Sequence, residues 1–257
     1  MGLLNSIEKY CHENNVENEA ISSFFKSGFP TTKNEEWKYT SLKKVVSEDY
    51  QINKEEAEIT DEEIKKQSLN IGDKIVFING FLHKKPNIKG VTIENNFFEN
   101  LSFEDPITAL NSGLAEHGFK ISIDKNVVVE SPIEILFLNK YNSNSFVQFR
   151  NKIILNENAQ VKIVENIQNL SENLCFINNV TEISLSKNSN LELNKLQNYS
   201  SSQNTIDTTN VNQQEKSTST INTMLFGGAF TRNNLSFFQN GQNCESNMNG
   251  IVILSNN

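Results

Sequence analysis

The residues of this chain best suited to metal binding, nucleophilic attack or proton transfer are its three cysteines and three histidines. They are Cys11, Cys175, Cys244, His12, His83 and His117. They lie far apart and form no C-x-x-C pair or cysteine–histidine cluster, so their spacing indicates neither a disulfide framework nor a metal site. We expect each cysteine to be a structural thiol rather than an iron ligand, including Cys175 and Cys244. Each histidine is expected to lie on the surface or to have a structural role.

Acidic residues of the second half could form a catalytic pair only if two of them converged. They are Glu157, Glu165, Glu172, Glu182, Glu192 and Asp207. They alternate with apolar neighbours, which is typical of solvated outward positions, and we expect no catalytic pair among them. Arg232 is an isolated cation among Asn and apolar residues. We expect it to pair with a buried carboxylate or a corner carbonyl, with contact to a partner as the alternative. These residues assign no catalytic group and no metal ligand, and they leave any cofactor-binding residue unknown.

The elements that position these residues are predicted by a repeat. Ile153-Ile154-Leu155, a corner with Asn158 and Val161-Lys162-Ile163 recur 30 residues later. The copy consists of Ile183-Ser184-Leu185, Asn188 and Leu191-Glu192-Leu193, and a fainter copy begins at Ile121. A fixed period of this length is typical of a solenoid, and alternation of apolar and polar residues makes each coil β rather than α. We therefore predict a right-handed parallel β-helix over residues 119–257, in which equal positions of consecutive coils stack, after an N-terminal helical or α+β domain over residues 1–118.

The N-terminal domain begins with two helical patterns. Leu3 to Cys11 and Ala20 to Phe25 have helical spacing, and Gly28 with Pro30 ends the second. Asn34 is a candidate N-cap, and Trp37, the only tryptophan, is expected to anchor its segment to the domain body.

Further along the N-terminal domain, Lys54 to Gln67 is a charged run in which Thr60 and Glu63 have the spacing of a capping box for a short exposed helix. A solvated face or linker is the alternative that we favour for this run. Lys74 to Leu82 predicts a hairpin around Asn79-Gly80, with Val91 to Ile93 as a strand that pairs with it. Asp105-Pro106 then begins a helix that ends before Gly118.

Asn-rich corners punctuate the second half. Asn tolerates a left-handed backbone and can stack in ladders, so it suits the corners of a β-helix. The last strand, Gly250 to Ser255, is apolar and has no capping element after it. Because a solenoid needs a cover at each end, we expect the chain to be incomplete at its C-terminus, with Leu235, Phe237, Ile251 and Ile253 as core positions of an open coil.

Composition limits the class of partner. The net charge is -8 with 37% hydrophobic residues, which excludes a disordered chain and argues against nucleic-acid binding. No apolar run of membrane-spanning length and no secretory signal pattern is present, so we expect a cytoplasmic protein.

One segment and several shorter motifs carry a family resemblance. Gly28–Thr40, with Glu35-Glu36-Trp37-Lys38-Tyr39-Thr40, is similar to the Gly-x-Pro…acidic-acidic-Trp-[Lys/Arg]-Tyr-Thr segment of SufD-type proteins. Shorter similar pieces follow in the family's order: Phe77–Gly80, Ala109–Asn111, Glu130–Ile133, Lys195–Gln197, Arg232–Leu235 and Met248–Gly250. The chain thus resembles the SufD branch of the SufB/SufD family of iron–sulfur cluster assembly proteins over most of its length.

This resemblance implies a helical N-terminal domain joined to a β-helix. It also implies a non-catalytic scaffold subunit in a complex with a SufB-like scaffold subunit and a SufC-like ATPase. The iron–sulfur cluster and ATP would be handled by the complex, with no cofactor bound by this segment. Family members continue through further coils and a C-terminal helical region that carries the ATPase contact, so the resemblance implies a C-terminal truncation and transfers no functional residue to a position here.

Two other functions fit a β-helix. A polysaccharide lyase or glycoside hydrolase would need converging carboxylates or basic residues along a groove with aromatic sugar platforms, and it would work outside the cytoplasm. A structural repeat protein would show many near-identical coils, whereas this sequence shows about two good copies. The sequence therefore favours the assembly scaffold.

Overall fold

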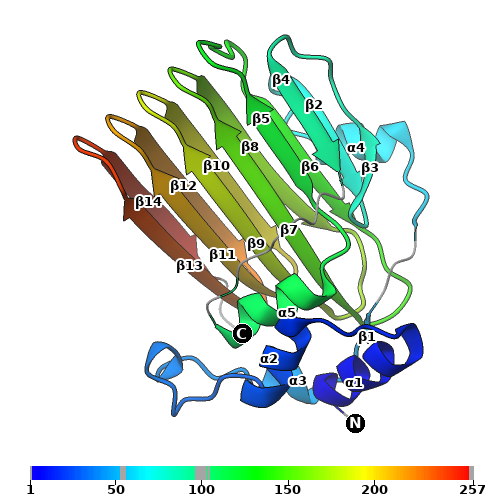
Figure 1. Cartoon of the computed structure of the whole chain (residues 1–257). Coiled ribbons are helices and arrows are strands. Elements are labelled where there is room, and N and C mark those ends of the chain that lie inside the picture. The colour runs from blue at the N-terminus through cyan, green and yellow to red at the C-terminus, as the bar shows by residue number, and fades with distance from the viewer. Residues whose placement is uncertain (1, 53–55, 96–102, 104, 255–257) are drawn as a thin grey trace.

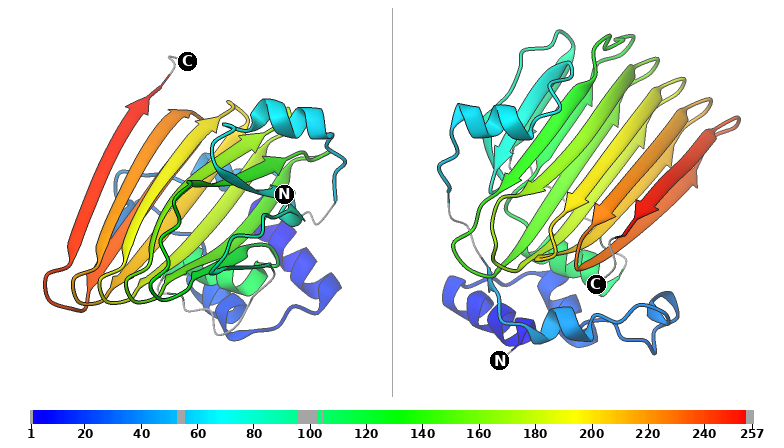
Figure 2. Two further views of the ribbon diagram at one scale, coloured as in Figure 1. Left: turned by 90° about the horizontal axis from the view of Figure 1, so that it is seen from above. Right: turned by 180° about the vertical axis from the view of Figure 1, so that it is seen from behind.

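Two facing sheets of mostly parallel strands form the body of the molecule in a computed structural model that describes residues 2–52, 56–95, 103 and 105–254. Sheet A has the strand order β13-β11-β9-β7-β5-β4, with β1 paired to β7. Sheet B has the order β14-β12-β10-β8-β6-β2-β3. From β5 onward, successive strands alternate between the sheets, and strands of consecutive coils lie side by side in all views (Figures 1 and 2). The predicted parallel β-helix is confirmed.

The strands of sheet A are β1 (Gln51–Ile52), β4 (Val91–Asn95), β5 (Phe119–Ile123), β7 (Ser145–Leu155), β9 (Cys175–Leu185), β11 (Gln203–Gln213) and β13 (Phe230–Gln239). Those of sheet B are β2 (Asp73–Ile78), β3 (Phe81–Lys84), β6 (Ile133–Asn139), β8 (Gln160–Asn169), β10 (Asn190–Tyr199), β12 (Thr218–Gly227) and β14 (Glu245–Ile253). The sheets therefore include four strands, β1 to β4, that precede residue 118.

The predicted stacking of equal positions is confirmed by the strand register. The paired residues are Ile153 with Ile183, Leu155 with Leu185, Val161 with Leu191, and Ile163 with Leu193. All eight side chains are buried and belong to one hydrophobic core between the sheets. Apolar burial of this kind is the main force that holds the coils together, because no coil can bury its inward side chains alone.

Asparagine forms the predicted ladder at one corner of the coils. Asn126, Asn158 and Asn188 all have a left-handed backbone, with φ of 62°, 60° and 57°. The Asn158 amide donates to Asn126 Oδ1 at 2.7 Å, and the Asn188 amide donates to Asn158 Oδ1 at 3.0 Å. Lys216 takes the same left-handed conformation further along the chain.

The helices are α1 (Leu3–Asn14), α2 (Glu19–Ser27), α3 (Lys43–Ser47), α4 (Asp61–Gln67) and α5 (Pro106–Leu114), with a 3-10 turn η1 (Glu35–Trp37). The helices α1, α2, α3 and α5 lie together at one end of the strands (Figure 1). Their apolar faces pack against Phe146, Phe176 and Ile206 on the outer side of sheet A.

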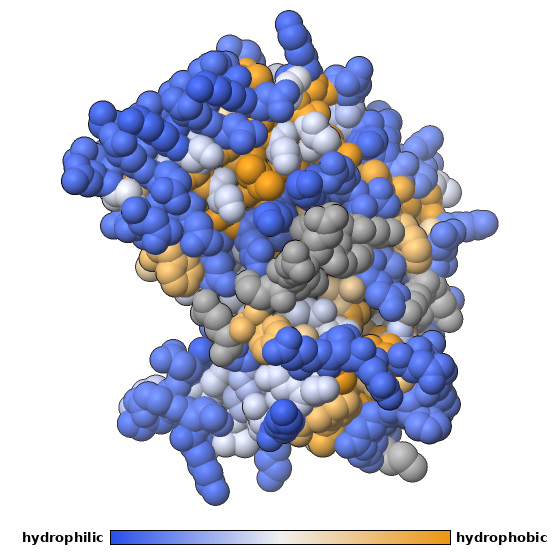
Figure 3. Space-filling model, in the orientation of Figure 1, coloured by the Kyte–Doolittle hydropathy of each residue, from blue (hydrophilic) through white to orange (hydrophobic). Residues whose placement is uncertain are grey.

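None of the helices described has the length and hydrophobicity needed to cross a membrane. Figure 3 shows a mostly hydrophilic surface with hydrophobic patches between the polar side chains.

Residues 61–67 of the charged run form the helix α4, so a linker is the wrong prediction for this part, whereas its charged side chains do form a solvated face. Thr60 and Glu63 form the capping box that begins α4. Ile59 and Ile64 are buried against Val76 and Leu136 on the outer face of sheet B. The charged residues occupy the opposite, solvated side of the helix. Because they dominate the composition of this run, composition alone did not indicate that α4 covers sheet B.

The hairpin around Asn79-Gly80 is confirmed, because β2 and β3 pair antiparallel and both turn residues have positive φ. The strand that follows does not pair with this hairpin. Instead β4 pairs antiparallel with β5 in sheet A, where Ile93 lies opposite Ile121 and joins the core between the sheets. Pairing with β5 in sheet A allows Ile93 to be buried in the core, which explains why β4 does not join the hairpin in sheet B.

Replacing Asp105 with alanine is expected to reduce the free energy of unfolding by about 1 kcal/mol, the usual effect of losing an N-cap. The Asp105 carboxylate accepts hydrogen bonds from the backbone amides of Ile107 (2.7 Å) and Thr108 (3.2 Å) at the start of α5. Urea denaturation followed by circular dichroism measures the change. The exposed Asp124 is the matched control, and an equal loss in Asp124→Ala would contradict the capping explanation.

The last described strand corrects one core prediction. Leu235 and Phe237 pack against the core as expected. Ile251 and Ile253, however, pair with Met224 and Phe226, which have the opposite parity to the core residue Leu225. They therefore lie on the outer face of sheet B and are 57% and 58% exposed. In so short an apolar run, the sequence alone did not determine which alternate residues point inward.

Candidate functional site

A layer of polar side chains interrupts the hydrophobic core between the sheets. Glu165 on β8 and Lys195 on β10 are in register as neighbours of sheet B, and Asp207 lies on β11 of sheet A. Their exposed fractions are 1%, 3% and 2%. The expectation that the acids of the β-helix are solvated is therefore wrong for Glu165 and Asp207.

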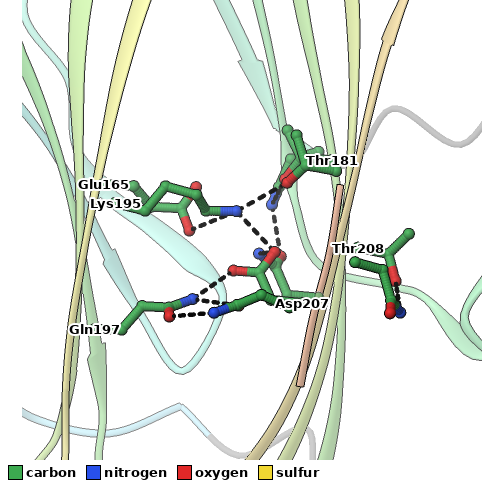
Figure 4. A network of polar contacts seen from close by, with 11 residues as sticks. Glu165, Thr181, Lys195, Gln197, Asp207 and Thr208 are labelled. Carbon is green, nitrogen blue, oxygen red and sulfur yellow. Dashed lines mark hydrogen bonds and ion pairs between the residues drawn. The ribbon is translucent and has the colours of Figure 1, made fainter. Parts of the chain in front are cut away.

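Lys195 is the centre of this layer (Figure 4). Its Nζ donates to Asp207 Oδ1 at 2.7 Å and to Thr209 Oγ1 at 2.9 Å. Glu165 Oε1 lies 3.8 Å from the same nitrogen, and its carboxylate accepts no hydrogen bond from the described residues. Asp207 is thus the closer counter-ion, and Glu165 is the second carboxylate of a buried triad.

Amides continue the layer on both sides of the triad. Gln197 donates to Asp207 Oδ2 at 3.0 Å and exchanges two hydrogen bonds of 2.9 Å with Asn233. On sheet A, Asn179 donates to Asp207 Oδ1 at 3.4 Å, and Asn151 donates to Asn179 Oδ1 at 2.8 Å. These hydrogen bonds join side chains from both sheets, so the layer cross-links the interior of the β-helix.

Burial determines the protonation behaviour of the triad. Desolvation raises the pKa of Glu165 to about 7, while Lys195 acts to lower it and Asp207 adds to the rise. Burial alone would lower the pKa of Lys195, but the charges of Asp207 and Glu165 outweigh it and the pKa is raised. Near neutral pH the lysine is therefore charged, and Glu165 is the group that gains or loses a proton.

This arrangement suits a structural role better than substrate chemistry. The three charged groups are almost completely buried, so a substrate in solution does not reach them. A lysine between two carboxylates can join the sheets and can bind or release one proton. Across the described parts of the chain, no three His, Cys, Asp or Glu side chains gather into a metal-ligating group. That this segment binds no metal stays a prediction.

The cysteines occupy separate positions. Cys11 is buried in the helical region, and Cys175 is buried in the core between the sheets. Burial raises the pKa of the Cys175 thiol to about 12, which strongly disfavours the thiolate that would bind iron. Cys244 is half-buried at a turn, where its thiol donates to the carbonyl of Gln214 at 3.2 Å.

The histidines also lie apart. His12 and His83 are exposed, as expected. His117 is buried, and the centroid of its ring lies 4.6 Å from that of the Phe81 ring. This packing agrees with the structural role that was expected for a histidine away from the surface.

Arg232 joins two segments far apart in the sequence. Its guanidinium lies 4.1 Å from the Trp37 ring and donates to the carbonyl oxygen of Glu36 at 2.8 Å and to Thr40 Oγ1 at 3.2 Å. The expected carbonyl contact is thus found, although its acceptor is in the N-terminal segment and not at a corner of the β-helix. Trp37 is buried and anchors its segment as predicted.

Sequence reasoning missed the role of Lys195 and Gln197. Counting in steps of two from Leu193, a predicted inward residue, reaches both, and the same count from Ile163 reaches Glu165. This parity was the available signal for a buried polar layer. The contact with Asp207 had no signal, because it crosses from one sheet to the other.

Comparison with known proteins gives two matches. The family model described as "SUF system FeS cluster assembly, SufBD core domain" matches residues 137–257. The model described as "SufBD protein N-terminal region" matches residues 5–73. Together the two matches cover most of the chain, with the N-terminal region of the family before its core domain. No curated protein is significantly similar to it in sequence.

Proposed function

The chain belongs to the SufB/SufD family of SUF-system iron–sulfur cluster assembly proteins, and on this premise we propose that it is a non-catalytic scaffold subunit of the SufD type. The observation that carries the proposal is the match of both family regions within one chain. The likeness of the segment Gly28–Thr40 to SufD-type proteins supports the choice of branch. Trp37 and Thr40 of this segment contact Arg232 of the β-helix.

The proposed partners are a SufB-like scaffold subunit and a SufC-like ATPase in the cytoplasm. The cluster and ATP are handled by the complex, and this segment itself holds no cofactor.

The geometry does not favour a carbohydrate-active enzyme. Such an enzyme needs two carboxyl groups beside a glycosidic bond that the substrate can reach. The two acids that converge in the interior of this β-helix, Glu165 and Asp207, share Lys195 and are buried. A non-catalytic role is therefore the better proposal.

Coexpression with SufB-like and SufC-like proteins tests this function. We expect affinity purification of the tagged chain to recover both partners in a fixed ratio. Anaerobic addition of iron and sulfide should then produce a cluster absorption band on the complex but not on the isolated chain. Partners that assemble and bind a cluster equally well without this chain would contradict the scaffold role. A band on the isolated chain that is lost in Cys175→Ser or Cys244→Ser would show that these thiols are ligands.

A further inference from the structure

A cavity of about 350 Å³ lies between the Trp37 segment, the start of α5 and the outer face of sheet A. Its volume is within the range of small-molecule binding sites. The buried triad points into the interior of the β-helix, so this cavity is separate from it. The residues used below are Trp37, Asp105, Thr208, Asn210, Arg232 and Ser236, all of which line it.

The floor of the cavity consists of short, uncharged polar side chains. Thr208 and Asn210 on β11 are in register with Asn234 and Ser236 on β13. Asn234 donates to Thr208 Oγ1 at 3.2 Å, which holds two of these groups in place. Hydroxyl and amide groups on a rigid sheet can donate hydrogen bonds to a ligand without reorganising.

Arg232 supplies a positive charge at the edge of this floor. Three of its N–H groups donate to neutral oxygens, those of Asn234, Thr40 and the Glu36 backbone. A guanidinium has five N–H donors, so two have no acceptor among the described residues and can serve a ligand. Within the described residues Arg232 forms no ion pair with a carboxylate. Its Cζ lies 4.1 Å from the centroid of the Trp37 ring.

The other charges of the cavity are already engaged or solvated. Arg150 is paired with Glu182. The Asp105 carboxylate accepts hydrogen bonds at the N-terminus of α5, where the helix dipole offsets its charge. Glu36 is exposed at the rim, where water screens it. Among the charged residues that the structure describes around the cavity, Arg232 is the one that faces the polar floor without a carboxylate partner.

We propose that this cavity binds a small oxyanion, with a carboxylate or phosphate group against Arg232 and the floor hydroxyl and amide groups as donors. Arginine forms strong, directional hydrogen bonds with both groups. The proposal adds a ligand site to the scaffold and does not depend on its partners.

Trp37 provides a direct test because it is the only tryptophan. The chain is titrated with inorganic phosphate and with malonate, at ionic strength held constant with chloride. We expect a saturable change in tryptophan fluorescence and a rise in melting temperature with one or both anions. A change with phosphate alone or malonate alone identifies the group. A glutamate-rich peptide is titrated in the same way. The proposal is overturned if neither small anion gives a saturable change, including the case in which the peptide alone gives one.

Three variants locate the site. Arg232→Gln should weaken binding about tenfold or more, because it removes the charge-assisted hydrogen bonds. Since this change also loosens the Trp37 contact, Asn210→Leu combined with Ser236→Ala tests the floor without touching Arg232, and it should weaken binding as well. Lys187→Gln, at an exposed ion pair away from the cavity, is the matched control and should bind normally. Unchanged affinity in both the Arg232 and floor variants would show that the anion binds elsewhere.

Discussion

Replacing Asp207 with alanine is expected to lower the free energy of unfolding at pH 7 by about 3–5 kcal/mol, the usual cost of removing one partner of a buried ion pair. The change leaves Lys195 in the interior without the carboxylate that lies 2.7 Å from its Nζ. Glu165, at 3.8 Å, and Thr209 are then its remaining close partners. Urea denaturation, followed by circular dichroism and compared with the unchanged chain, measures the loss.

An exposed ion pair of the same solenoid is the matched control. Glu215 contacts Lys187 at 2.8 Å, as close as the buried pair, but both side chains are more than 40% exposed. Glu215→Ala should cause no measurable loss, because water already screens this pair. The double variant Lys195→Met with Asp207→Leu should lose less stability than Asp207→Ala alone, since it leaves no unpaired lysine. Equal losses in Asp207→Ala and Glu215→Ala would refute the explanation by burial.

The fold was predictable from the sequence where local rules act in every coil. Alternation predicted the apolar inward residues of the repeat in β7 to β10, and Asn158 and Asn188 marked a corner that needs a left-handed backbone. The later coils were harder to recognise because their spacing changes. Val211 pairs with Ile183 at a separation of 28 residues, and Phe237 pairs with Val211 at a separation of 26. Shorter corners alter the period without altering the stacking.

Parity could have placed Glu165, Lys195 and Gln197 in the interior, but the contacts of the candidate site were not predictable, because they cross between elements that sequence spacing does not relate. The acids were expected to be solvated because they alternate with apolar neighbours. A carboxylate that is buried instead requires a partner. For Asp207 that partner is Lys195, on the opposite sheet. Arg232 and Thr40 are 192 residues apart, and only the folded helical region brings them together. Local patterns determine coils and caps, whereas the polar layer and the Arg232 contact depend on the tertiary arrangement of the two sheets.

Replacing Glu165 with glutamine is expected to change how stability depends on pH. Burial raises the pKa of Glu165 from its ordinary 4.5 to about 7 in the folded chain, so the folded state binds the proton more tightly than the unfolded state. Stability from this group is therefore fully present below pH 4.5, falls as pH rises, and is lost above about pH 7. The full change corresponds to about 3 kcal/mol.

Urea denaturation at pH 5, 6, 7 and 8 tests this expectation. Relative to the unchanged chain, Glu165→Gln should gain stability progressively across this range, because glutamine has no charge to bury. Lys195 and Asp207 face Glu165 and interact with its charge, so the difference between the two proteins measures the titration of Glu165 together with its coupling to these two groups. Glu192→Gln, on the neighbouring strand β10, is the control. Its carboxyl pKa is lowered by a hydrogen bond from Asn194, so it should not alter the slope in this range. Parallel stability curves for the Glu165 variant and the unchanged chain would mean that Glu165 keeps its charge in the interior, stabilised by Lys195 more strongly than burial opposes it.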